Sequence, residues 1–99
     1  MPLADQVNES IFRAIEDINL QLPEGQRLEK SLGTMLYGRE GALDSLGLVN
    51  LIVAVEQHLL DDFKLTVKLD DEHALAHPSN VFISAESLSR YIQSRLQSR

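Results

Sequence analysis

The sequence predicts a small all-α protein. Three observations favour this fold class: aliphatic residues recur at spacings of three and four, the stretch 46–60 contains no proline, and aromatic residues make up only 5% of the chain. Spacings of three and four place side chains on one face of a helix. A chain of 99 residues, 43% of them hydrophobic, can form one domain, residues 1–99, with one modest core.

The first helix is predicted over residues 3–22, ending before Pro23 and Gly25. Its apolar stripe consists of Val7, Ile11, Ile15, Ile18 and Leu22. A long first loop, residues 23–43, follows and contains apolar residues that can form one or two helical turns. Loops of this length in compact domains are usually functional or held by their own apolar residues. We therefore expect the loop to be pinned onto the core by Leu28, Leu32 and Leu36.

The second helix is predicted from Ser45 to about Asp62. Asp44 precedes it, and a carboxylate at this position can accept hydrogen bonds from the free N–H groups of the first turn. The helix is apolar on more than one face, through Leu48, Val49, Leu51, Ile52, Val53, Val55, Leu59 and Leu60. Such a helix is buried by several neighbours, or it keeps one face for a docking partner.

The segment after this helix is expected to be extended. Residues 63–69 alternate between apolar and polar, and because no partner strand is present, we expect a linker with Leu65 and Val67 directed inward. Ser84 is then expected to cap a fourth helix from residue 85 to about residue 97. The buried stripe of this last helix is predicted to be Leu88, Tyr91, Ile92 and Leu96.

Between these segments, a short third helix is expected to begin after Asp70 or Asp71 and to stop near His77, because Pro78 disfavours helical geometry before it. His73 and His77 are four residues apart on this helix, so both could reach one metal ion. Zinc sites need three or four ligands, and beyond Asp70 no third ligand is evident. We therefore expect a surface histidine pair, and a metal-binding module is the weakest alternative.

Composition and charge exclude several classes of function. The chain has no cysteine, so it offers neither disulfides nor thiol chemistry of its own. Its formal net charge is −6 at pH 7, and most of this charge lies between residues 44 and 72. An acidic segment argues against nucleic-acid binding, which needs a basic face, and suits basic protein partners. With no membrane-spanning stretch and no secretory signal, we expect a cytoplasmic protein, and a monomeric one.

Asp44-Ser45-Leu46, followed by an apolar helix, resembles the phosphopantetheine attachment site of acyl carrier proteins. The tripeptide is common, but the resemblance covers most of the chain. The family's landmarks occur here in the same order: a helix with one apolar stripe, a long loop, Phe63 to Val67, Asp70-Asp71-Glu72, and Ser84 to Ile92. The resemblance implies a four-helix acyl-carrier-like bundle with three main helices, one short third helix and a long first loop.

The resemblance also implies a cofactor and partners. Ser45 would carry 4′-phosphopantetheine, added from coenzyme A by a magnesium-dependent phosphopantetheinyl transferase, with Asp44 and Leu46 beside it. A helix N-terminus favours such a phosphate. Acyl groups would travel as thioesters among acyl-transfer, synthase or ligase enzymes, and the chain itself would not be an enzyme. An acyl cleft beside the second helix is expected, and Val53 and Leu59 are expected to line either the core or this cleft.

Two departures from the family pattern indicate a specialised carrier. Gly47 and Asn50 stand where the family often has acids, so residues 46–55 carry no charge. We expect Gly47→Asp with Asn50→Glu to improve turnover by general fatty-acid enzymes. A dedicated partner is expected to read an apolar surface around Leu46 and Leu48, with secondary contacts to Glu56, Asp61 and Asp62.

Other functions stay open at this point. Gly41 to Ser45 looks more like the approach to the serine in D-alanyl and aminoacyl carriers, so the cargo is undecided among fatty-acid, lipid, surface-polysaccharide and aminoacyl pathways. From another class, the chain could be a helical adaptor whose acidic middle docks a partner and never carries cargo. A serine hydrolase is discounted, because the Gly-x-Ser-x-Gly elbow and a strand before Ser45 are missing.

Overall fold

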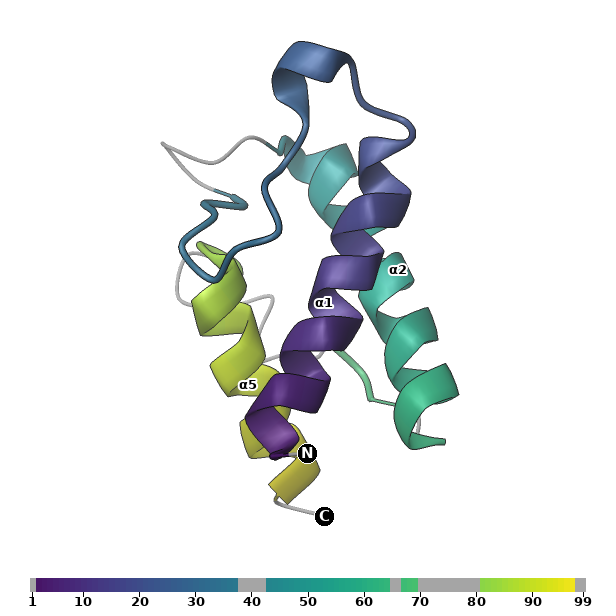
Figure 1. The fold of residues 1–99 in the computed structure, drawn as a ribbon, viewed down its shortest axis with the longest axis vertical. Helices are drawn as coiled ribbons and strands as arrows, with labels where there is room; N and C mark the ends of the chain where they lie inside the picture. The colour runs from purple at the N-terminus through teal and green to yellow at the C-terminus, as the bar shows by residue number, and fades with distance from the viewer. Residues whose placement is uncertain (1, 38–42, 65–66, 70–80, 98–99) are drawn as a thin grey trace.

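The computed structural model describes residues 2–37, 43–64, 67–69 and 81–97. Within these ranges it has three α-helices, α1 (Leu3–Asn19), α2 (Ser45–Phe63) and α5 (Ala85–Gln97). It also has one 3₁₀ turn, η1 (Glu24–Gln26), and no strand. Figure 1 shows α1 against both other helices, with the start of α1 and the end of α5 at the same end of the molecule. The predicted all-α class is confirmed for these residues, whereas the predicted short third helix lies outside them.

The apolar stripe of α1 is buried as its spacing predicts. Its buried side chains are Val7, Ile11, Ala14, Ile15 and Ile18. The helix ends at Asn19 rather than at Leu22, because the N–H groups of Gln21 and Leu22 donate to carbonyls three residues earlier, at 2.9 and 3.2 Å. These tight turns leave the helical path before Pro23, so Leu22 is only partly buried at the edge of the core.

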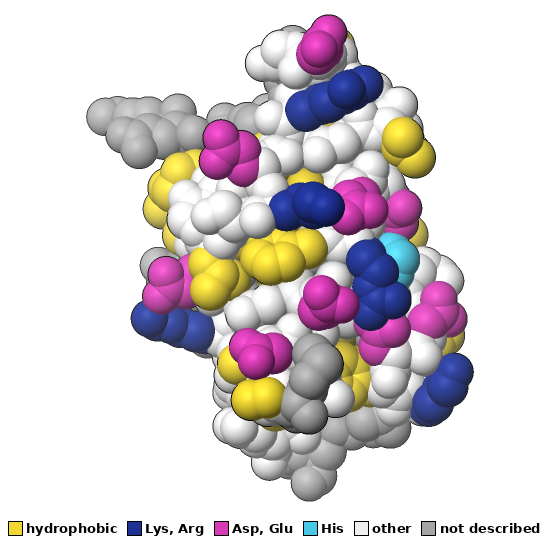
Figure 2. Space-filling model, viewed as in Figure 1, with side chains coloured by type: hydrophobic (Ala, Val, Ile, Leu, Met, Phe, Trp, Pro, Cys, Tyr) yellow, Lys and Arg dark blue, Asp and Glu magenta, His cyan; other side chains and the backbone are white. Residues whose placement is uncertain are grey.

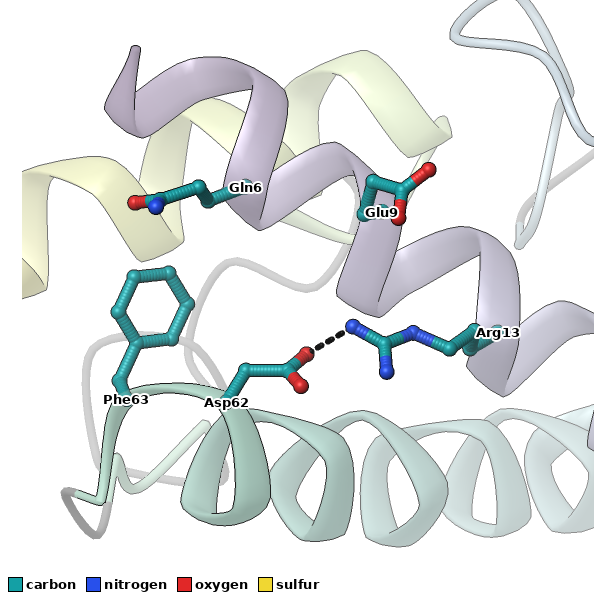
Figure 3. A pocket seen from close by; sticks show the side chains of 5 residues that line it. All are labelled: Gln6, Glu9, Arg13, Asp62 and Phe63. Atoms are coloured by element: carbon teal, nitrogen blue, oxygen red, sulfur yellow. Dashed lines mark hydrogen bonds and ion pairs between the residues drawn. The ribbon is translucent and has the colours of Figure 1, made fainter. Parts of the chain in front are cut away.

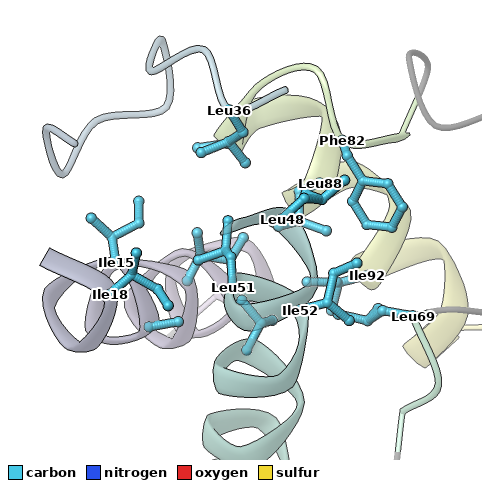
Figure 4. Packing of buried hydrophobic residues seen from close by; sticks show 14 of the residues in the cluster. Ile15, Ile18, Leu36, Leu48, Leu51, Ile52, Leu69, Phe82, Leu88 and Ile92 are labelled. Atoms are coloured by element: carbon cyan, nitrogen blue, oxygen red, sulfur yellow. The ribbon is translucent and has the colours of Figure 1, made fainter. Parts of the chain in front are cut away.

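The core lies where the three helices meet the segments that precede α2 and α5. Figure 4 shows Ile15 of α1, Leu51 of α2, Leu88 of α5 and Phe82 pointing into the same interior space, and all four are at most 1% exposed. The α2 side of this core consists of Leu48, Leu51, Ile52, Val55 and Leu59. Phe82 is the only aromatic side chain buried in the described part of the chain, so the core is aliphatic, as the composition predicts.

The first loop is held to α1 by the side chain of Asn19. Its amide donates to the carbonyl of Leu28 at 2.9 Å and accepts from the Leu28 N–H at 2.8 Å. Leu28 and Leu36 are buried as predicted, but Leu32 is 36% exposed, so the prediction that it pins the loop is wrong. The reason is that residues 27–37 form turns and extended backbone, in which a spacing of four does not return a side chain to the same face.

α5 begins and ends where the sequence predicts. The Ser84 hydroxyl accepts from the Ser87 N–H at 3.2 Å, and the Ser87 hydroxyl accepts from the Ser84 N–H at 3.1 Å, so the two residues cap the helix reciprocally. The N–H of Ala85 donates to the carbonyl of Thr34 at 3.0 Å, which fastens the first loop to the same helix end. The buried residues of α5 are Ala85, Leu88, Ser89 and Ile92, whereas Tyr91 and Leu96 are partly buried.

Polar side chains join α1 to the second half of α2. The Asp62 carboxylate pairs with the Arg13 guanidinium at 2.5 Å (Figure 3). It also accepts a hydrogen bond from the buried Ser10 hydroxyl at 2.5 Å. His58 Nε2 lies 2.6 Å from Asp17 Oδ2. Figure 2 shows that acidic and basic side chains are interspersed on the face that α1 dominates, rather than separated by sign. These contacts restrict the rotation of α2 about its axis and so help to decide which apolar face of α2 is buried.

Candidate functional site

The candidate site lies at the N-terminus of α2, which begins at Ser45 as predicted. The backbone of Asp44 is extended, its carboxylate accepts from the Gly47 N–H at 2.7 Å, and its carbonyl accepts from the Leu48 N–H at 2.9 Å. In this geometry a side-chain oxygen satisfies one of the first-turn N–H groups that lack a partner within the helix. The predicted role of Asp44 as N-cap is therefore confirmed, and Ser45 is the first residue of the helix.

The start of α2 is held in place by backbone contacts with two other segments. The N–H of Leu43 donates to the carbonyl of Leu36 at 3.0 Å, and the N–H of Leu36 donates to the carbonyl of Ile83 at 2.8 Å. The side chains of Leu43 and Leu36 are both buried. Leu36 thus connects the residue before the Asp44 cap to the segment that leads into α5. The sequence carries no signal for this connection, because every residue has the same backbone groups.

One face of α2 is apolar and exposed. Its four side chains are Leu46 (70% exposed), Val49 (53%), Val53 (51%) and Leu60 (42%), and their spacings of three, four and seven place them along one side of the helix. We call these four residues the outer stripe. The predicted surface position of Leu46 agrees with this arrangement. The prediction that Leu48 belongs to the same surface is wrong, because Leu48 is 7% exposed and packs in the core on the opposite side.

The two residues proposed to line the core or an acyl cleft lie on different sides of α2. Leu59 is fully buried in the core, whereas Val53 belongs to the outer stripe, so the interior placement of Val53 is wrong. A hollow between α1 and the end of α2 is lined by Gln6, Glu9, Arg13, Asp62 and Phe63 (Figure 3). It lies about 26 Å from Ser45 along α2, at a rise of ~1.5 Å per residue. Neither Val53 nor Leu59 lines it, and an acyl cleft beside α2 stays a prediction.

The three late acids of α2 have different environments. Glu56 accepts a hydrogen bond from the Leu69 N–H at 3.0 Å and so holds the extended segment, in which Val67 is buried as predicted. Asp61 is exposed. Partial burial raises the pKa of the Asp62 carboxyl, but the hydrogen bonds from Ser10 and Arg13 and the positive charges of Arg13 and His58 outweigh this and lower it overall. Asp61 is therefore the one of the three whose carboxylate forms no internal hydrogen bond or ion pair with the described residues.

The described ranges contain neither a metal-ligand cluster nor a membrane-spanning helix. No group of three or more His, Cys, Asp or Glu side chains there is arranged to hold a metal ion. His73 and His77, the pair considered as metal ligands, lie outside these ranges, as does Leu65 of the predicted linker. None of the helices in the described part of the chain is long and apolar enough to cross a membrane.

Comparisons with known proteins identify no relative of this chain. A scan against protein-family models, a search of curated proteins and a search of solved structures each find no match. The function must therefore be inferred from the residues and geometry at the start of α2 and from the resemblance of its motif.

Proposed function

We propose that this protein is a carrier that holds acyl groups as thioesters on a 4′-phosphopantetheine arm attached to Ser45 and passes them between enzymes. The observation that carries the proposal is the start of α2. Asp44 caps the helix through the Gly47 N–H, Ser45 occupies the first helical position, and an exposed Leu46 follows. This arrangement supports a modified serine, because the first turn of a helix stabilises a negatively charged phosphate.

The first turn of α2 suits a phosphodiester. The Asp44 side chain takes the N–H of Gly47, so the N–H groups of Ser45 and Leu46 are left at the positive end of the helix dipole, where a phosphate is stabilised. No acidic residue lies in this first turn. The arm would supply a thiol, which a chain without cysteine lacks.

The outer stripe supports a dedicated partner. Leu46 and Val49 lie beside the proposed attachment point, and Val53 and Leu60 continue the same apolar surface toward the exposed Asp61. A partner with an apolar surface and a basic residue near Asp61 would complement this face. We propose a specialised cytoplasmic carrier for fatty-acid, lipid or surface-polysaccharide biosynthesis, monomeric when free, that meets a phosphopantetheinyl transferase and acyl-transfer, synthase or ligase enzymes. A D-alanyl or aminoacyl carrier is the alternative within this class.

Mass spectrometry tests the proposal directly. The protein is incubated with coenzyme A, magnesium and a broad-specificity phosphopantetheinyl transferase, and is then weighed intact. We expect the wild type and Ser31→Ala, a variant of an exposed loop serine, to gain one phosphopantetheine each. Ser45→Ala should gain none.

The second candidate function is a helical adaptor that binds a partner through the outer stripe without carrying cargo. Four exposed apolar side chains on one helix face favour it, because such faces often mark interaction sites. A wild-type chain that stays unmodified under conditions in which a known carrier is fully modified would support the adaptor and contradict the carrier.

A further inference from the structure

The hollow between α1 and the end of α2 combines an aromatic ring with polar side chains. Figure 3 shows the Phe63 ring pointing from α2 toward Gln6, with Glu9 and Arg13 further along α1. Phe63 is partly buried against the core, so one side of its ring is held by packing while the rest lines the hollow. The volume of the hollow is about 230 Å³, below the ~300–1,000 Å³ of most small-molecule pockets. The hollow therefore suits a single side chain better than a whole small molecule.

Two carboxylates that line the hollow have acceptor oxygens without a donor. Glu9 and Arg13 are four residues apart on α1, a spacing at which opposite charges often pair, but the Arg13 guanidinium pairs with Asp62 instead. Among the described residues, no hydrogen bond or ion pair reaches the Glu9 carboxylate. Ser10 and Arg13 both donate to Asp62 Oδ2, and no donor in the described ranges reaches Oδ1. Two carboxylates and one guanidinium leave the hollow with one net negative charge.

We propose that this hollow is a docking site for one arginine side chain of a partner protein. A guanidinium is planar and carries five N–H donors, so it can stack on the Phe63 ring and donate to the carboxylate oxygens beside it. The negative charge of the hollow and the net charge of −6 of the whole chain both attract a basic partner. Arginines seated in small pockets are frequent anchors of protein interfaces. The hollow lies at the opposite end of α2 from Ser45, so this inference does not rest on the proposed function.

Titration with a blocked arginine, followed by backbone amide chemical shifts, tests the site. The probe is N-acetyl-arginine methylamide, and its neutral control is the citrulline derivative, in which a urea group replaces the guanidinium. We expect saturable shifts at the lining residues of both helices, with the citrulline derivative binding about tenfold more weakly and the lysine derivative about threefold more weakly. Equal binding of the citrulline derivative would refute the site, and equal binding of the lysine derivative would refute arginine as its occupant. Shifts confined to Asp5 and Phe12, which line a second hollow beside Glu9, would also refute it.

Two variants that each remove one negative charge separate the hollow from the general charge of the chain. Glu9→Gln changes the hollow, whereas Glu24→Gln changes an exposed position beyond the other end of α1. We expect Glu9→Gln to weaken binding of the blocked arginine by about two- to fivefold and Glu24→Gln to leave it unchanged. Equal weakening in both variants would refute the site, because the overall charge would then explain the binding. Free arginine that binds about tenfold more tightly than the blocked form would overturn the protein partner, because the hollow would then recognise a free amino acid.

Discussion

Replacing Ser10 with alanine tests whether a charged hydrogen bond joins α1 to α2. The Ser10 hydroxyl is fully buried and donates to the Asp62 carboxylate, which also pairs with Arg13. A hydrogen bond to a charged group contributes about 1.5–3 kcal/mol. The lower end applies, because Asp62 keeps Arg13 and its side chain is 21% exposed, so water can replace the hydroxyl. The better helix propensity of alanine offsets up to ~0.5 kcal/mol.

The expected loss is therefore about 1 kcal/mol, which corresponds to about 4–8 °C in Tm for a domain of this size. The loss should depend on pH. The pKa of Asp62 is lowered in the folded protein, so the stabilisation is present above the ordinary value of 3.8 and is lost as the pH falls through the folded value. Below that value Asp62 is protonated, and the difference between wild type and Ser10→Ala should shrink.

Urea denaturation followed by circular dichroism, at about pH 7 and at a pH below the folded pKa of Asp62, measures both effects. Ser89→Ala is the matched control, because Ser89 is a second buried serine among the described residues and its hydroxyl donates to the neutral amide oxygen of Asn8. The loss in Ser89→Ala should be the same at the two pH values. An equally pH-insensitive loss in Ser10→Ala would show that Ser10 makes no charged hydrogen bond to Asp62.

Two further predictions concern packing and the first loop. Leu48→Ala should lower the free energy of unfolding by about 2–5 kcal/mol, because Leu48 is in the core. Val53→Ala on the outer stripe should change it by less than about 0.5 kcal/mol. Equal losses in urea titrations would contradict the assigned faces of α2. Asn19→Asp should cost about 1–2 kcal/mol, because a carboxylate cannot donate to the Leu28 carbonyl. The same change at the exposed Asn50 should cost less than about 0.5 kcal/mol, and a similar loss at both positions would show that the Leu28 contact is not responsible.

The features that sequence reasoning predicted correctly are local ones. The stripe of α1 follows from a spacing that one helix repeats, and the caps at Asp44 and Ser84 depend on residues within one turn. Fold class follows from the same periodicity. The sequence therefore predicts the start of α2, where the candidate site lies, better than it predicts the surroundings of that site.

The features that sequence reasoning missed depend on contacts between distant segments. α2 carries two apolar stripes, and only packing against α1 and α5 decides that Leu48 is inside and Val53 outside. Similarly, Ser10 reads as a neutral position in a helix until Asp62 is brought beside it. Local spacing contains no information about these partners, so both the buried face of α2 and the polar contacts of α1 required the structure.

The backbone link through Leu36 has a consequence for the order in which the protein folds. The three helices can form quickly from contacts within each segment, but the link that joins Leu43 to Leu36 also joins Leu36 to Ile83, and these last two residues are far apart in the chain. Closing long loops costs conformational entropy and slows folding. We therefore expect the anchoring of α2 at its first turn to be completed late, after the segment leading into α5 has docked. An enzyme that recognises the start of α2 would therefore act on fully folded chains and not on partly folded ones.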